Sequence, residues 1–263
     1  MKPEILTRAF DAIVPRVHLD KKEIRMASHS QKGNANRIKT GTTIMVFYFS
    51  DGIIFAGDRK TSTMSLRIIS LETIKIYELA PYVAMGGAGL VSDIQYLVDL
   101  MTELNHGFVS KFENPLSIRG QANFLAGHLR DFRYYVDSFG LEASFIIGGI
   151  NLENKFSIFE VYEDGSQRSV QDYSVIGSGT DGAMCVLREK KKELAEKKLG
   201  LEESIDLAVK AIHRAAEIDN GTSDIRVAHP TIFKITSKGF EAVDGVTIGR
   251  AVERLIEKDV RNG

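Results

Sequence analysis

Residues 41–60 read GTTIMVFYFSDGIIFAGDRK, and this stretch decides the fold. Residues 43–49 are rich in β-branched and aromatic side chains, residues 50–52 (Ser-Asp-Gly) form a turn signal, and residues 53–56 are again apolar. Two strand-like runs joined by such a turn predict a β-hairpin. The ordered part of the chain is therefore expected to begin at Thr42.

The sequence before Thr42 has a different character. Residues 19–38 are polar and basic, with no clean helical or strand period, and segments of this kind pack poorly. We expect residues 1–41 to form a loosely packed leader, although composition alone favours an ordinary loose terminus. Charges are scattered through residues 1–22 without an apolar stretch, which argues against a secretory signal.

Downstream of the hairpin, strand-like and helix-like patterns come in separate blocks. Strands are expected at 67–70, 73–79, 82–86, 143–150, 156–162, 170–176, 231–236 and 240–243, and helices around 91–101, 122–132, 182–199, 205–216 and 247–260. Such blocks argue against the alternating order of a parallel Rossmann sheet and suit stacked antiparallel sheets with helix pairs outside. We therefore predict an α+β fold, with residues 42–263 as one domain.

Composition limits the possible partners. Hydrophobic residues make up 43% of the chain, charged residues make up 26%, and the formal net charge is -1. This balance is ordinary for a soluble globular protein and does not indicate a nucleic-acid or membrane partner. No apolar run approaches the roughly 18 residues of a membrane span. A cytoplasmic protein is expected.

Several kinds of site are disfavoured. The single cysteine, Cys185, excludes an intrachain disulfide, and its apolar helical neighbours predict a core position. No pair of the six histidines has metal-ligand spacing, so no metal site is expected. The glycine-rich stretches at 86–89 and 177–179 do not complete a dinucleotide-binding motif, and no P-loop is present, so no cofactor is expected. Ser178 lacks the outer glycines of a serine-hydrolase elbow.

A different kind of nucleophile remains possible where the leader meets the first strand, at Gly41-Thr42. A threonine hydroxyl becomes a useful nucleophile when a base is adjacent, and a free N-terminal amine on the same residue can be that base. Its pKa of about 8 suits this role. The amine exists only after the preceding bond is cut, and the small Gly41 leaves room for the Thr42 hydroxyl to attack its carbonyl.

Three further residues fit this chemistry. Asp58 follows the second strand, and Lys75 lies in a later strand-like segment. A carboxylate beside a lysine keeps the lysine charged and oriented, and a cation near the amine favours its neutral, basic form. Gly89 can present a backbone N–H to a developing oxyanion. A structural ion pair between Asp58 and Lys75, or two solvated charges, is the alternative interpretation.

The stretch GTTIMVFYFSDGIIFAGDRK, followed by TIKIYELAPYVAMGGAGLVSD, resembles the catalytic β-subunits of the bacterial and archaeal proteasome core particle. FIIGGI, YSVIGSGT and IHRAAEIDNGTSD match in order, and the resemblance runs from Thr42 to near the C-terminus. It implies the four-layer αββα sandwich of the N-terminal nucleophile hydrolases. It also implies a threonine-type endopeptidase that is activated by autocatalytic cleavage between Gly41 and Thr42.

The resemblance assigns a role to each matching residue. It implies that Thr42 is the nucleophile, that Asp58 holds Lys75, that Lys75 tunes Thr42, and that the Gly89 N–H stabilises the oxyanion. Ser178 and Asp219 would support the Thr42 amine. Two departures stand out: the spacing from Asp58 to Lys75 is one residue longer than expected, and Thr222 replaces a serine three residues after Asp219.

The resemblance also implies a substrate pocket. In the family, the pocket for the residue before the scissile bond is lined near the positions of Thr61, Gly87 and Val91. Because glycine lacks a side chain, Gly87 predicts a deep pocket and a preference for larger apolar residues.

The implied partners are those of a barrel-shaped protease. They comprise a homo-heptameric β ring paired with a second β ring, flanking α-subunit rings, an ATPase or other activator ring, and unfolded protein substrates. Three alternatives stay open: the peptidase of the two-ring bacterial ATP-dependent protease, a non-catalytic ring subunit, and a small-molecule amidase of the same superfamily. The first usually has Gly-Gln after Gly-Asp, where this chain has Arg59-Lys60.

Overall fold

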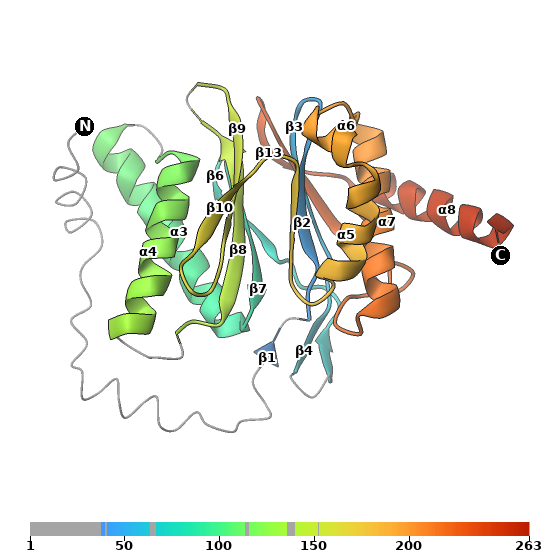
Figure 1. Cartoon of the computed structure of the whole chain (residues 1–263), viewed down its shortest axis with the longest axis horizontal. Coiled ribbons are helices and arrows are strands. Elements are labelled where there is room, and N and C mark those ends of the chain that lie inside the picture. Colours follow the sequence, from blue (N-terminus) through green and yellow to red (C-terminus); the bar gives the residue numbers. More distant parts are fainter. Residues whose placement is uncertain are drawn as a thin grey trace.

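The computed structural model of the chain describes residues 38–39, 41–63, 67–113, 116–135, 140–151 and 153–262. Most of the expected leader, residues 1–37 and 40, lies outside these described residues. Two five-stranded antiparallel sheets stack face to face between layers of helices (Figure 1). The predicted α+β, four-layer αββα sandwich is confirmed.

The first sheet has the strand order β11-β2-β3-β12-β13. Its members are β11 Tyr173–Ile176, β2 Ile44–Phe49, β3 Gly52–Gly57, β12 Thr231–Thr236 and β13 Gly239–Ala242. The expected hairpin is the β2–β3 pair, with Phe49 opposite Gly52 at the turn.

The second sheet has the order β10-β9-β8-β7-β6. Its members are β10 Gln167–Val170, β9 Phe156–Val161, β8 Ala143–Ile150, β7 Val83–Gly89 and β6 Ile76–Ala80. A small third sheet, β1-β4-β5, consists of Ile38–Lys39, Thr61–Thr63 and Ile68–Ser70.

The uninterrupted apolar sequence of β2 has a simple cause, which is burial on both faces. Met45 and Phe47 pack into the core between the first sheet and its helices, whereas Ile44 and Val46 pack into the core between the two sheets. Because side chains alternate across a strand, a strand covered on both sides must be apolar throughout.

Helices cover the outer face of each sheet (Figure 1). Helices α3 Val91–Phe112 and α4 Ile118–Tyr135 pack on the second sheet. The first sheet is covered by α5 Thr180–Glu189, α6 Lys191–Ala195 and α7 Leu201–Ile218, with α8 Gly245–Asn262 against α7. None of the helices within the described ranges is apolar over a length that would cross a membrane.

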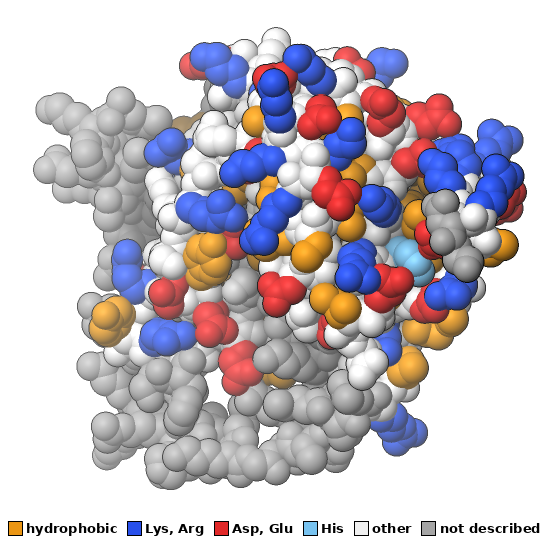
Figure 2. All heavy atoms as spheres, turned by 45° about the vertical axis from the view of Figure 1, so that its right-hand side comes forward, with side chains coloured by type: hydrophobic (Ala, Val, Ile, Leu, Met, Phe, Trp, Pro, Cys, Tyr) orange, Lys and Arg blue, Asp and Glu red, His pale blue; other side chains and the backbone are white. Residues whose placement is uncertain are grey.

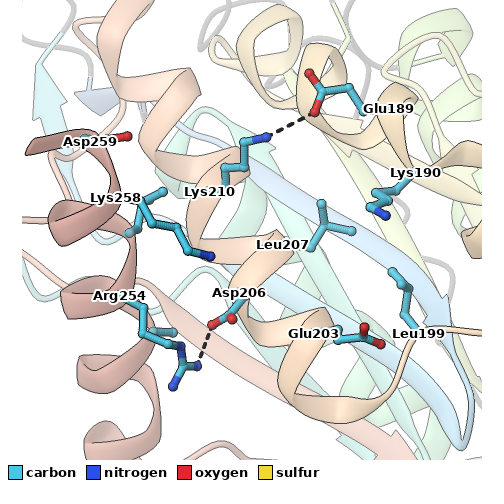
Figure 3. A pocket seen from close by; sticks show the side chains of 12 residues that line it. Glu189, Lys190, Leu199, Glu203, Asp206, Leu207, Lys210, Arg254, Lys258 and Asp259 are labelled. Carbon is cyan, nitrogen blue, oxygen red and sulfur yellow. Dashed lines mark hydrogen bonds and ion pairs between the residues drawn. The ribbon is translucent and has the colours of Figure 1, made fainter. Parts of the chain in front are cut away.

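Ion pairs join α8 to α7 and α7 to α5. Arg254 donates to Asp206 at 2.6 Å (Figure 3). Arg254 also lies 3.2 Å from Glu202, and both contacts tie α8 to α7. Lys210 pairs with Glu189 at 3.0 Å and ties α7 to α5. Positive and negative side chains are interspersed on the face that this helical layer presents (Figure 2).

Four local predictions were wrong. The strand expected at 170–176 is two strands: β10 ends at Val170 in one sheet and β11 begins at Tyr173 in the other. The helix expected at 182–199 is interrupted at Lys190 and ends at Ala195. Lys75 lies just before β6 rather than inside it. Cys185 is on α5 as expected, but its side chain is exposed rather than part of the core.

Candidate active site

The candidate site lies at one edge of the sandwich, where several strands begin or end. In the first sheet, Ile44 at the start of β2 is opposite Gly57 at the end of β3 and Ile176 at the end of β11. Antiparallel pairing therefore brings the residues flanking these ends together, although they are far apart in sequence. Thr42, Asp58 and Ser178 are three such flanking residues.

Thr42 is fully buried and lies two residues before Ile44, the first residue of β2. Its N–H donates to Ser178 Oγ at 3.1 Å, and its carbonyl oxygen accepts from the N–H of Gly179 at 3.3 Å. The turn that brings Ser178 here needs glycine at 177, where φ is +101° and a Cβ would overlap the Thr42 carbonyl. Thr42 Oγ1 makes no hydrogen bond with any residue that the structure describes.

Lys75 and Asp58 form a buried ion pair beside Thr42. Lys75 Nζ lies 2.8 Å from Asp58 Oδ1, and both side chains are almost fully buried, with 1% and 0% exposure. Burial lowers the pKa of Lys75, and the Asp58 carboxylate opposes this shift. The same ammonium donates to the carbonyl oxygen of Gly41 at 2.8 Å. The cation therefore contacts the peptide bond that precedes Thr42.

The Asp58 carboxylate is held by donors on both oxygens. Oδ1 accepts from the Thr43 N–H at 2.9 Å in addition to Lys75, and Oδ2 accepts from the N–H groups of Lys60 at 2.9 Å and Ser223 at 3.2 Å. An ionised carboxylate only accepts hydrogen bonds, so this set fits a charged Asp58. Neither Thr43 nor Ser223 was a sequence candidate, and 165 residues separate Ser223 from Asp58.

A second carboxylate, Asp219 at the end of α7, organises the other side of Thr42. Asp219 Oδ2 accepts from Ser178 Oγ at 2.8 Å and from Thr222 Oγ1 at 2.7 Å, and Oδ1 accepts from the Gly221 N–H at 2.9 Å. Ser178 thus connects Asp219 to the Thr42 nitrogen. The structure also shows that Thr222 contacts Asp219 through its hydroxyl, so the threonine there keeps a donor to this carboxylate.

Gly41 is held tightly in front of Thr42. A Cβ added at Gly41 would overlap the Gly221 backbone, and a Cβ at Gly221 would lie 2.8 Å from the Gly41 Cα. Just upstream, β1 pairs with β4, so that Lys39 is opposite Ser62 and Ile38 is opposite Thr63. Residues 38 and 39 therefore lie in an extended antiparallel pairing.

The other predicted positions lie nearby. Gly89 ends β7, where its φ of +142° and the close Glu142 carbonyl require glycine. Its role as an oxyanion donor stays a prediction. Thr61 is buried and donates to Thr73 at 2.7 Å, and Val91 is half-buried at the start of α3. Whether Thr61, Gly87 and Val91 form one substrate pocket also stays a prediction.

The space beside Gly87 does not support the argument for a deep pocket. A Cβ at Gly87 would lie 2.8 Å from Phe145 Cε1 and 2.9 Å from Ile94 Cγ2. Phe145 is directly opposite Gly87 on β8. The missing side chain is thus compensated by a large neighbour.

Within the described residues, no three His, Cys, Asp or Glu side chains are grouped to hold a metal ion.

Antiparallel sheets stack between helix layers, and a threonine just before β2 lies where two carboxylates and a lysine converge. These features define the class of the N-terminal nucleophile hydrolase fold. The family model for proteasome subunits matches residues 38–229. The chain belongs to the proteasome subunit family.

Curated relatives identify the type of subunit. The "Proteasome subunit beta" of Methanosarcina mazei is 28% identical over 204 residues, covering 78% of this chain and 90% of the relative. That of Archaeoglobus fulgidus is 30% identical over 188 residues, with 72% and 84% covered. The "Proteasome subunit beta 1" of Pyrococcus horikoshii is 30% identical over 196 residues, with 74% and 93% covered. The chain is thus a β-type proteasome subunit.

Proposed function

We propose that this chain is a catalytic threonine endopeptidase subunit, made as a precursor that cuts itself between Gly41 and Thr42. The contact from the buried Lys75 ammonium to the Gly41 carbonyl oxygen carries this proposal. A cation at that oxygen stabilises the negative charge that develops when the carbonyl carbon is attacked. The Thr42 hydroxyl, one residue away, is buried and makes no hydrogen bond within the described residues.

Self-cleavage proceeds as an acyl shift. Thr42 Oγ attacks the Gly41 carbonyl carbon, the new C–O bond forms, and the C–N bond of the peptide breaks. The hydroxyl proton ends on the released Thr42 nitrogen, whose N–H already donates to Ser178 Oγ. Water then hydrolyses the ester, which leaves the Gly41 carboxylate on the leader and a free hydroxyl and amine on Thr42.

The mature site uses the same groups on a substrate. The Thr42 amine takes the Oγ proton, directly or through a water, and Oγ attacks the substrate carbonyl. Lys75, held by Asp58, favours the neutral amine, while Ser178, Asp219 and Thr222 fix its position. The Gly89 N–H is the proposed oxyanion donor. The leaving amine takes the proton, and water hydrolyses the acyl-enzyme.

The domain assignment and the partners follow from the same proposal. Residues 1–41 are the propeptide and residues 42–263 are the peptidase domain. The mature chain forms a homo-heptameric β ring that pairs with a second β ring in the cytoplasm. The α-subunit rings and an activator ring admit unfolded proteins. The β-subunit names of its relatives support this assembly.

The first residue of the assembled chain tests the proposal. We expect N-terminal sequencing and intact mass of the purified particle to give Thr42 as the first residue, because the Lys75 ammonium contacts the Gly41 carbonyl oxygen next to the Thr42 hydroxyl. A chain that still carries upstream residues after assembly would have no free amine at Thr42. A non-catalytic ring subunit would then be the better account.

Substitution of Gly41 tests the tight contact with Gly221. We expect Gly41→Ala to slow leader removal by about 10- to 100-fold, because the added Cβ displaces the carbonyl from Lys75 and from the attacking hydroxyl. The measurement is a time course of precursor and mature chain on a denaturing gel.

A matched glycine provides the control for this experiment. Gly245, at the start of α8, has no atom within 4 Å of an added Cβ. Gly245→Ala should therefore be processed at the wild-type rate. If Gly41→Ala also loses its leader at that rate, the contact with Gly221 does not constrain the cleaved bond.

A further inference from the structure

Thr43, the residue after the candidate nucleophile, makes contacts that no catalytic role yet explains. It is fully buried. Its N–H donates to Asp58 Oδ1 at 2.9 Å, and its carbonyl oxygen accepts from the Asp58 N–H at 3.1 Å. The two hydrogen bonds clamp the Thr43 backbone to the residue that holds Lys75.

The Thr43 side chain is connected to the second carboxylate, Asp219, through the hydroxyl of Thr222. Thr43 Oγ1 lies 2.6 Å from Thr222 Oγ1, and Thr222 Oγ1 donates to Asp219 Oδ2 at 2.7 Å. A hydroxyl has one proton, and Thr222 uses its proton on Asp219. Thr43 must therefore be the donor to Thr222. A directed chain of hydrogen bonds runs from Thr43 through Thr222 to Asp219.

The backbone around this chain leaves space for both hydroxyls. A Cβ at Gly179 would overlap Thr43 Oγ1 and lie 2.6 Å from Thr222 Oγ1. The N–H of the same glycine donates to the Thr42 carbonyl. Gly179 thus admits the pair of hydroxyls and contacts the residue before Thr43.

We propose that Thr43 is a positioning residue that couples the Asp58–Lys75 pair to the Asp219–Ser178 pair and so fixes Thr42 between them. This inference rests on the proposed function of Thr42 as the nucleophile. Thr43 is bound to one carboxylate through its backbone and to the other through its side chain. Because the Thr43 nitrogen is bonded to the Thr42 carbonyl carbon, these connections restrain the backbone from which the Thr42 nitrogen and hydroxyl project.

The hydroxyl of Thr43 is the testable part. Valine has the shape of threonine but cannot donate, so Thr43→Val leaves a buried Thr222 oxygen without its donor. We expect kcat of the processed enzyme on a fluorogenic peptide to fall about tenfold. KM should stay within about twofold, since Thr43 is fully buried. Thr43→Ser keeps the hydroxyl and should restore most of kcat.

Three further variants distinguish coupling from general damage. Thr222→Val removes the next hydroxyl in the chain, and the double variant Thr43→Val/Thr222→Val should lose little more than either single variant, because residues in one network are not additive. Thr236→Val is the control, because Thr236 lies at the end of β12 and its hydroxyl accepts a hydrogen bond from the Lys238 N–H at 3.1 Å. It should keep wild-type kcat and KM.

The outcomes are separable from those of the proposed function. A wild-type particle without a processed Thr42 overturns the proposed function itself. A processed, active wild type overturns this inference alone if Thr43→Val keeps its kcat, if Thr43→Ser fails to restore kcat, or if the losses of the two valine variants add. Should Thr43→Val not assemble, wild-type kcat in Thr222→Val would overturn it equally.

Discussion

Thr42→Ala is expected to keep its leader and to lose peptidase activity by at least about 10⁴-fold, because the variant lacks the only proposed nucleophile. The fold should tolerate this change. Thr42 Oγ1 makes no hydrogen bond with any described residue, so its removal leaves no donor or acceptor unpaired. The measurements are the intact mass of the assembled chain and the rate of fluorogenic peptide hydrolysis.

Two controls separate chemistry from processing. Thr42→Ser keeps a hydroxyl and should mature and cleave peptides. A Thr42→Ala chain that a separate protease releases from an N-terminal fusion, so that it begins at position 42, has the free amine without the hydroxyl and should be inactive. Removal of the leader from Thr42→Ala at the wild-type rate would mean that another nucleophile, or another protease, makes the cut.

Lys75→Ala is expected to have the second largest effect. It removes the donor to the Gly41 carbonyl and leaves Asp58 buried without its counter-ion. Loss of a preorganised donor to a developing oxyanion costs about 10²–10³ in rate. Breaking a buried ion pair costs about 3–5 kcal/mol of stability. We expect no leader removal over hours, and an activity at least about 10³-fold lower when the chain is made to begin at Thr42.

The stability and the activity of this variant must be measured separately. Thermal unfolding of Lys75→Ala will report the unpaired Asp58, and Lys75→Ala combined with Asp58→Asn should regain part of that stability but none of the activity. Lys238→Ala, at an exposed position of the β12–β13 turn, is the control. A folded Lys75→Ala chain that still matures would remove Lys75 from the mechanism.

Much of the fold could be predicted from the chain because its strongest patterns are local. The β2–β3 hairpin follows from two apolar runs around Ser50-Asp51-Gly52, and both strands are buried on both faces. The segment 170–176 shows the limit. Val170 and Tyr173 are both buried, and the chain passes from one sheet to the other across Gln171 and Asp172 between them. An apolar pattern predicts that a segment is buried, but it does not predict which strand the segment pairs with.

The proximity of three candidate residues was predictable, whereas their roles stay predictions. Thr42, Asp58 and Lys75 were expected together, and Lys75 contacts both Asp58 and the Gly41 carbonyl oxygen next to Thr42, despite the longer spacing between Asp58 and Lys75. Contacts between distant segments were not predictable. Thr43 and Thr222 are 179 residues apart, and nothing in either local sequence indicates that their hydroxyls meet.

Neighbours that are distant in sequence also limit what Gly87 can predict about the substrate pocket. From the sequence alone, Gly87 predicts open space, because the residue has no side chain. Its neighbour on β8, Phe145, fills that space. The size of a pocket depends on every element that borders it, so one lining position cannot determine it.

The position of α8 has a practical consequence for handling the protein. This helix leaves the body beside α7, well away from β1 and β4 at the candidate site (Figure 1). An affinity tag fused at the C-terminus would therefore stay with both precursor and mature chain without approaching Thr42. A second, different tag at the N-terminus would be lost with the leader. The ratio of the two tag signals on one blot would then follow maturation inside living cells.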